Sequence, residues 1–215
     1  MQSSQPARSS LILGITLAAS FVLGGCTAPL MLGTALFGGT AWIMSDKRTP
    51  GVQLEDHTIE IKAYNRAIEL IGDKGHVVVT SFNRQVLLTG EVFNESDKRA
   101  VEQAARRVDN VASVNNELVV TWPSSSSERS NDMMLATKVR ATLIDASNVP
   151  SQAFKVVVER GVVYLMGRVK AAEANKATEL TRNIAGVRKV VRLLDIVAPD
   201  PADPALLPPR PTAPY

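Results

Sequence analysis

The hydrophobic and polar positions of the chain follow a pattern that appears twice. Residues 77–92 hold two apolar runs, rich in Val and Leu, on either side of a short polar turn, which is typical of a β-hairpin. Residues 156–169 show the same pattern with a turn shorter by two residues. From the turn onward the spacing is constant and predicts two copies of one folding unit. The matched pairs are Val86 and Val163, Leu88 and Leu165, Gly90 and Gly167, and Val92 and Val169.

Each hairpin is flanked by stretches whose apolar residues recur every three or four positions, as in amphipathic helices. A further apolar strand closes each copy. The predicted fold is therefore α+β, with two tandem α-β-β-α-β modules, each a small three-stranded sheet covered by two helices. The expected helices are 56–71, 96–108, 132–144 and 171–184, and the closing strands are 111–120 and 187–197.

The amino-terminal segment has the layout of an export signal. Arg8 precedes an apolar run over residues 11–23, which ends in Leu23-Gly24-Gly25-Cys26. This ending resembles the lipobox of bacterial lipoproteins, in which the cysteine becomes the acylated amino terminus. We expect residues 1–25 to be a signal peptide and Cys26 to be lipidated, since more than one acyl chain anchors a protein stably. The alternative is an uncleaved membrane helix that ends in a buried cysteine.

The residues after Cys26 indicate where the protein would go. Thr27 stands where an inner-membrane retention signal would have Asp, so by resemblance the destination is the outer membrane, periplasmic face. The apolar stretch 30–44 is shorter than the roughly 20 residues that span a bilayer. We therefore interpret residues 26–54 as a lipidated juxtamembrane segment. Fusion of this stretch with the signal region into one anchor is the alternative.

Composition divides the rest of the chain. Residues 123–130 contain four consecutive serines and are typical of a linker. Residues 198–215 contain seven prolines and predict an exposed, disordered, polyproline-like tail. The expected modules are residues 55–122 and 131–197.

The hairpins resemble the BON module, whose pattern is G-x-V-x-L-x-G-x-V, then a helix, then a G-V-x-x-V strand entry. The second copy fits with Gly161, Gly167 and Gly186, and the first keeps only Gly90, with Arg84 and Asn110 at the other two positions. We expect the four glycines to be structural, with Gly90 and Gly167 letting a helix pack close to the strand. With the lipobox, the chain resembles the dual-BON outer-membrane lipoproteins of the DolP (YraP) type.

No residue pattern for catalysis or metal binding is recognisable in the sequence. His57, His76 and the single Cys26 are too few for a zinc site or a nucleophilic relay, and both histidines are expected at surface ends of elements. The carboxylates of the first copy fall on expected helix surfaces, with no pair in an apolar setting that would shift a pKa. The chain is therefore expected to be no enzyme and to use no metal or cofactor.

Charge is divided unevenly between the copies. Residues 55–122 carry 8 basic and 11 acidic side chains, whereas residues 131–197 carry 11 basic and 6 acidic ones. The net charge of the whole chain is only +3, which argues against a nucleic-acid partner. The second copy is thus the one suited to an anionic partner.

The first helix of the second copy carries the candidate binding residues. Asp132 is the expected N-cap, and Leu135 begins the stripe that faces the sheet. Met133 and Met134 then lie at an exposed helix start, near two cations. One alternative is that the methionines pack against the first copy or the linker. The other is a membrane-surface wedge, in which methionines enter lipid and cations meet phosphates.

The resemblance to DolP-type proteins implies that this helix binds anionic phospholipid, phosphatidylglycerol or cardiolipin. In those proteins an aromatic residue stands at the position of Met134, so methionine removes an interfacial anchor. The resemblance also implies support of envelope integrity, division-site functions, and links to envelope-assembly or cell-wall-remodelling proteins. The alternative is a periplasmic protein–protein adaptor without lipid recognition by the modules. The expected lipid-contact residues are Met133, Met134, Leu135, Lys138 and Arg140.

Overall fold

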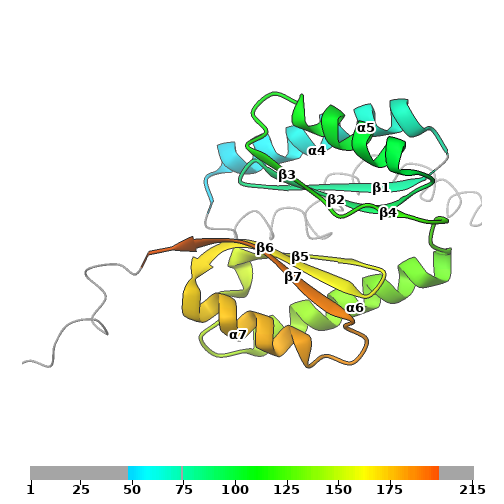
Figure 1. Cartoon of the computed structure of the whole chain (residues 1–215). Helices are drawn as coiled ribbons and strands as arrows, with labels where there is room; N and C mark the ends of the chain where they lie inside the picture. Colours follow the sequence, from blue (N-terminus) through cyan, green and yellow to red (C-terminus); the bar gives the residue numbers. More distant parts are fainter. Residues whose placement is uncertain (1–47, 74, 199–215) are drawn as a thin grey trace, which may run out of the picture. The chain divides into compact units, whose positions relative to one another are not determined.

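The computed structural model describes residues 48–73 and 75–198, which are coloured in Figure 1. The expected signal peptide, Cys26, the stretch 30–44 and the proline-rich tail beyond residue 198 lie outside the described residues. In the part that is described, no helix is both long and apolar enough to cross a membrane. The α-β-β-α-β order occurs twice, which confirms the predicted α+β fold of two tandem modules.

In the first module, two helices cover one face of a mixed sheet (Figure 1). Its elements are α4 (Pro50–Ile71), β1 (His76–Phe82), β2 (Gln85–Val92), α5 (Glu95–Arg106), β3 (Ser113–Asn116) and β4 (Val119–Val120). The central strand β2 pairs antiparallel with β1 and parallel with β3 and β4. The expected single strand over 111–120 is split, because Leu118 turns into the core and its N–H donates to the Asn116 side chain, 3.2 Å away.

The second module repeats this plan with a simpler sheet, in the order β5-β6-β7. Its elements are α6 (Ser126–Asp145), the short 3-10 helix η1 (Ser151–Ala153), β5 (Phe154–Glu159), β6 (Val162–Lys170), α7 (Ala171–Arg182) and β7 (Lys189–Val197). Strand β6 is central, antiparallel to β5 and parallel to β7. Helices α6 and α7 lie on the same face of this sheet (Figure 1).

Alternation of side chains along the hairpins determines which sheet face the helices cover. Val86, Leu88 and Val92 of β2 point toward α4 and α5 and are almost completely buried. Each such side chain stabilises the fold by about 1.5–3 kcal/mol when fully buried. The matched residues of β6 fill the core of the second module: Val163, Leu165 and Val169.

Helix α6 begins earlier than the sequence pattern suggests. Ser125 is the N-cap: its hydroxyl accepts from the Glu128 N–H at 3.3 Å, and the Glu128 carboxylate accepts from the Ser125 N–H at 2.7 Å. This reciprocal capping box satisfies two backbone donors at the helix start. The prediction of a linker over 123–130 is therefore wrong from residue 126 onward, and the prediction of Asp132 as N-cap is also wrong.

Asp132 instead lies inside α6, is 9% exposed, and binds the turn of the second hairpin. Its two carboxylate oxygens accept from the N–H groups of Arg160 and Gly161 at 2.7 and 2.8 Å. Asp56 of α4 binds the first hairpin turn in the same way, through the N–H groups of Asn83 and Arg84 at 2.8 Å each. In both modules a buried helix carboxylate thus holds a turn whose two central residues have positive φ.

The positive φ values explain how the first module does without two of the family glycines. Gly161 has φ +71° and Arg84, at the matched turn position, has φ +65°. Gly186 has φ +102° and Asn110 has φ +66°. Left-handed backbone disfavours a side chain, so arginine at position 84 depends on the hydrogen bond from its N–H to Asp56.

The expected role of Gly90 and Gly167 is wrong in its physical cause. A Cβ at Gly90 would lie 1.9 Å from the carbonyl oxygen of His76, on the neighbouring strand β1. A Cβ at Gly167 would lie 2.4 Å from the carbonyl oxygen of Ala153, at the end of η1. The glycines therefore make room for adjacent backbone rather than for a helix.

In each module, the sheet face opposite the helices is also covered. The two such faces pack against each other, and all described residues belong to one compact unit. Ion pairs flank the apolar contact: the Lys155 Nζ lies 2.7 Å from the Glu60 Oε1, and the Arg160 Nη1 lies 3.2 Å from the Glu91 Oε1. The buried apolar residues of this contact are Phe82, Leu87, Tyr164 and Met166.

Candidate functional site

The two methionines are exposed, but they lie in the middle of α6 rather than at the predicted helix start, because the helix begins at Ser126. Met133 is 71% and Met134 is 57% exposed, so the described residues of the first module do not cover them. Trp122, the aromatic residue nearest in sequence, packs edge to face on Phe93, with ring centroids 4.9 Å apart, and is itself 76% exposed. The structure thus places two flexible apolar side chains in solvent.

Lys138 lies on the same flank of α6 as Met134, since four residues correspond to about 40° around a helix. Beside them is a cleft of about 230 Å³, whose opposite wall is formed by the turns at Gly161 and Gly186. The Arg188 side chain lies over Gly161, because a Cβ there would be 2.8 Å from its Cδ. Lys138 thus lines the cleft, and the Arg188 side chain packs on Gly161, a residue of the opposite wall.

Arg188 is a functional candidate that the sequence interpretation missed. It stands in the Gly186-Val187-Arg188-Lys189 entry to β7, and that basic dipeptide next to a predicted glycine turn was the available signal. Its guanidinium Nη1 lies 3.4 Å from the Arg160 carbonyl oxygen, which fixes it near the hairpin turn.

Two of the expected lipid-contact residues have other places in the structure. Leu135 is 7% exposed and packs in the core of the second module, so its assignment to the contact set is wrong. Arg140 lies on the other flank of α6, near Met133, and donates through Nη2 to the Val156 carbonyl oxygen at 3.0 Å. Arg140 therefore also binds the backbone of the edge strand β5. A guanidinium carries five N–H groups, and this bond uses one of them.

Helix α4 of the first module provides a comparison. It also exposes apolar side chains, including Ile61 at 48% and Tyr64 at 46%. Its charges differ, however, because Glu60 and Glu69 lie on the helix and Lys62 is 3.5 Å from Asp109. Exposed apolar residues alone do not distinguish the helices, whereas the sign of the neighbouring charge does.

A buried polar cluster lies where the two sheets meet. Glu91 is completely buried and Glu159 is 8% exposed, while the His76 Nδ1 lies 3.4 Å from the Glu91 carboxylate. Burial raises the pKa of Glu159 from 4.5 to about 7, with further contributions from the nearby carboxylates of Glu91 and Asp132. The expectation that no carboxylate pair has an apolar setting is therefore wrong, and His76 is half-buried beside this pair.

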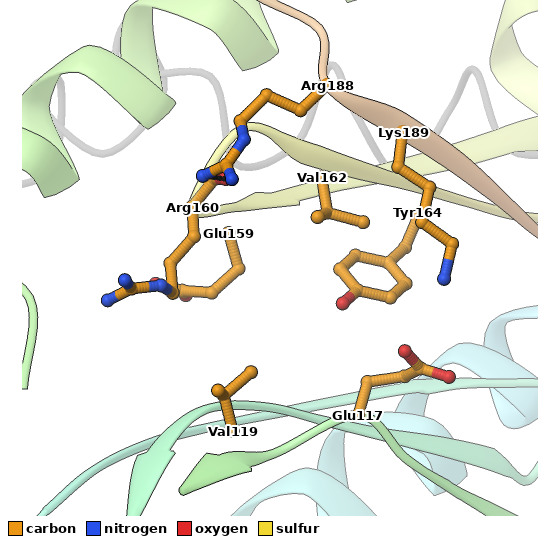
Figure 2. Close-up of a pocket in the computed structure, with 8 residues that line it drawn as sticks. All are labelled: Glu117, Val119, Glu159, Arg160, Val162, Tyr164, Arg188 and Lys189. Atoms are coloured by element: carbon orange, nitrogen blue, oxygen red, sulfur yellow. Dashed lines mark hydrogen bonds between the residues drawn. The ribbon is translucent and has the colours of Figure 1, made fainter. Parts of the chain in front are cut away.

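A second cleft, of about 340 Å³, is lined by Glu159 of this cluster (Figure 2). Figure 2 shows the Glu159 and Arg160 side chains at one end and the Tyr164 ring facing Glu117 at the other. Burial raises the pKa of Tyr164 above its ordinary value, and the carboxylate of Glu117 adds to this effect. Arg188 and Lys189 also line the cleft, so its walls carry both signs of charge.

Comparison with known proteins agrees with the repeated fold. Residues 54–121 and 131–198 match the family model of the BON domain. The chain is 36% identical to the outer membrane lipoprotein DolP of Haemophilus influenzae over 184 residues, 84% of this chain and 93% of that protein. It is 29% identical to a 21 kDa hemolysin of Actinobacillus pleuropneumoniae, over 71% of this chain and 79% of that protein.

More distant matches follow. Osmotically-inducible protein Y of Escherichia coli is 24% identical, over 85% of this chain and 92% of its own. Among solved structures, the C-terminal domain of CdsD, a structural protein of the type III secretion system of Chlamydia trachomatis, aligns with 64% of this chain and 98% of its own. That alignment has 14% identity and a TM-score of 0.29.

The two family matches cover more than half of the chain, and the similarity to DolP extends over nearly all of that protein. The chain therefore belongs to the BON family, and within it to the outer-membrane lipoproteins with two BON modules that resemble DolP.

Proposed function

We propose that the protein binds anionic phospholipid, phosphatidylglycerol or cardiolipin, through α6 of its second BON module. The observation that carries this proposal is the exposure of Met133 and Met134 beside Lys138. The two acidic residues that precede them on α6 have other partners: Asp132 is buried against the hairpin turn, and Glu128 is bonded to Ser125. Flexible apolar side chains next to cations fit the interface between lipid tails and phosphates.

The expected strength follows from these side chains. Full burial of a methionine contributes about 1.5–3 kcal/mol, so inserting two that are already partly covered contributes about 2–4 kcal/mol. Each cation close to an anionic surface adds about 1 kcal/mol. The sum corresponds to a dissociation constant of roughly millimolar order. Such weak binding suffices if acyl chains on Cys26 hold the module at high local concentration beside the membrane.

The wider role is then non-enzymatic. A lipid-anchored protein whose module also binds anionic headgroups would accumulate where anionic lipid is enriched. From there it would support envelope integrity and division-site functions. The similarity to an outer membrane lipoprotein supports this assignment. Partners in envelope assembly or cell-wall remodelling are part of the same proposal.

An exposed aromatic patch on the first module favours protein docking as a second candidate function. Trp122 and Phe93 are 76% and 38% exposed, and Val119 and Val120 of β4 are exposed as well. Exposed aromatic residues are enriched at protein interfaces. In this adaptor alternative, lipid contact comes from the acyl chains alone.

Vesicle flotation separates the two functions. A fragment that begins at residue 46 keeps both module cores and lacks the expected acyl chains. We expect it to float with vesicles of phosphatidylglycerol at millimolar lipid, less with neutral phosphatidylcholine, and less as salt rises, because exposed charges are screened over about 8 Å at physiological ionic strength. Failure to float, or equal flotation with both lipids, would contradict lipid-charge recognition by the module.

A further inference from the structure

We propose that His76, Glu91 and Glu159 form a binding site for one divalent transition-metal ion, for which Zn²⁺ is a suitable probe, and that the ion joins the two BON modules. His76 and Glu91 belong to β1 and β2 of the first module, and Glu159 ends β5 of the second. One potential ligand atom from each residue lies within 4.8 Å of the others. One imidazole nitrogen and two carboxylate oxygens are donors that Zn²⁺ accepts.

The spacing of the donors suits a small ion. Zinc ligands lie about 2.0–2.2 Å from the metal, so two ligands of a tetrahedral site are ~3.4 Å apart. The His76 Nδ1 and the Glu91 Oε2 are 3.4 Å apart. In the proposed site, rotation of the Glu159 side chain closes the remaining separation, and the adjacent cleft, which Glu159 lines, provides an entry path.

Two atoms of the cluster have no hydrogen-bond partner in the part of the chain that the structure describes. They are the Glu159 Oε1 and the His76 Nδ1, both inaccessible to solvent, and Glu159 as a whole is 8% exposed. A buried carboxylate without a donor is costly, and a cation or a proton removes that cost. Both residues that carry these atoms belong, with Glu91, to the group whose potential ligand atoms lie within 4.8 Å of one another.

The charges around the cluster are compatible with a bound cation. Arg160 donates from Nη1 to Glu91 Oε1 at 3.2 Å, and the Ser124 hydroxyl lies 3.4 Å from Oε2. Arg160 thus orients Glu91 as an outer partner, a common arrangement around metal ligands. With both carboxylates ionised, Arg160 charged and His76 neutral, the cluster carries a net charge of −1. Gly90 fixes the backbone of His76 at close approach, since any Cβ there would collide with its carbonyl oxygen.

Metal binding is tested on the full chain in detergent, without a histidine tag and after chelator treatment. Calorimetric titration with Zn²⁺ is expected to give one ion per chain, and Zn²⁺ should raise the Tm, because an ion that binds only the folded state stabilises it. His76→Gln and Glu159→Gln should each weaken binding at least about tenfold. Binding should also weaken at lower pH, since protons compete for the ligands.

The matched control is His57→Gln. His57 is exposed and lies 3.8 Å from Glu60 on the same helix, so it also pairs a histidine with a carboxylate. This variant should bind Zn²⁺ within about twofold of the native protein, a change too small for loss of a ligand. Electron paramagnetic resonance of the native protein with Cu²⁺ should show coupling to one imidazole, a result that does not depend on the folding of any variant.

The proposal is overturned by any of three results. These are no stoichiometric ion in the native protein, unchanged affinity in both His76→Gln and Glu159→Gln, or loss of affinity in His57→Gln of the same size. If Glu159 holds a proton instead of helping to bind an ion, the first of these results is the one observed.

Discussion

Replacing Asp132 tests how this residue of α6 stabilises the second module. The predicted N-cap and the carboxylate that binds the hairpin turn lead to different results. At an N-cap, asparagine serves as well as aspartate, so Asp132→Asn would leave stability unchanged. In the structure, each carboxylate oxygen accepts a separate backbone N–H, from Arg160 at 2.7 Å and Gly161 at 2.8 Å. An asparagine has one acceptor oxygen and must turn its NH₂ group toward the other N–H.

The magnitude follows from the two bonds. A hydrogen bond to a charged group contributes about 1.5–3 kcal/mol, and a buried donor left without a partner costs about 1–3 kcal/mol. Asp132→Asn should therefore lower the free energy of unfolding by about 1–3 kcal/mol, and Asp132→Ala by about 3–5 kcal/mol, with both donors orphaned. Asp56→Ala is the matched change in the first module, where Asp56 also accepts from Ser81 Oγ at 2.7 Å.

Hydrogen exchange measures this effect locally and does not require two-state unfolding of a two-module chain. The amides of Arg160 and Gly161 should exchange faster in both Asp132 variants, while those of Asn83 and Arg84 stay protected. Asp56→Ala should give the reverse pattern. Asp132→Asn with unchanged stability and unchanged exchange at Gly161 would refute the assigned role and restore the N-cap interpretation.

Three further predictions address other parts of the chain. Mass spectrometry of membrane-extracted protein should show the mature chain starting at an acylated Cys26, and an unmodified Cys26 with the signal attached would overturn this. Lys138→Ala with Arg188→Ala should weaken binding to anionic vesicles by up to about 1 kcal/mol per cation and leave neutral vesicles unaffected. The pKa of Glu159 is raised from 4.5 to about 7 in the folded, metal-free protein, so the folded chain keeps a proton that the unfolded chain loses. The stability that is present below pH 4.5 is therefore lost as the pH rises through about 7. Glu159→Gln should therefore reduce the fall in Tm between pH 5 and pH 8, and an unchanged fall would contradict the shift.

The hairpins and their flanking helices could be predicted because their signals are local. Alternation within β2 and β6 identifies the residues that face the helices, such as Val86 and Leu165, without any knowledge of distant contacts. The positions of Met133 and Met134 followed from helix periodicity in the same way. Their exposure agrees with the face assigned to them.

The buried carboxylates could not be predicted, because they depend on contacts far apart in the chain. Asp132 binds a turn 28 residues away, and Glu91 meets Arg160 across 69 residues. Alternation placed Glu91 on the sheet face opposite the helices, which a single isolated module would expose to solvent. A signal was present nonetheless: Leu87 and Met166 are apolar on that same face, where only a second layer would bury them.

The central claim is that α6 of the second module contacts anionic lipid, and one pair of variants tests it most directly. Met134→Asp and Ile61→Asp each place a carboxylate at an apolar position exposed by about half, on α6 and α4 respectively. At an anionic membrane, Met134→Asp loses the methionine insertion and adds charge repulsion, which together cost about 2 kcal/mol, or roughly thirtyfold in vesicle binding.

Both substitutions lie on exposed helix faces, so the stability of each variant should stay within about 0.5 kcal/mol of the native fragment. Flotation of the fragment beginning at residue 46 with phosphatidylglycerol vesicles should be nearly abolished by Met134→Asp and unchanged by Ile61→Asp. Equal flotation of the two folded variants would contradict lipid contact through α6.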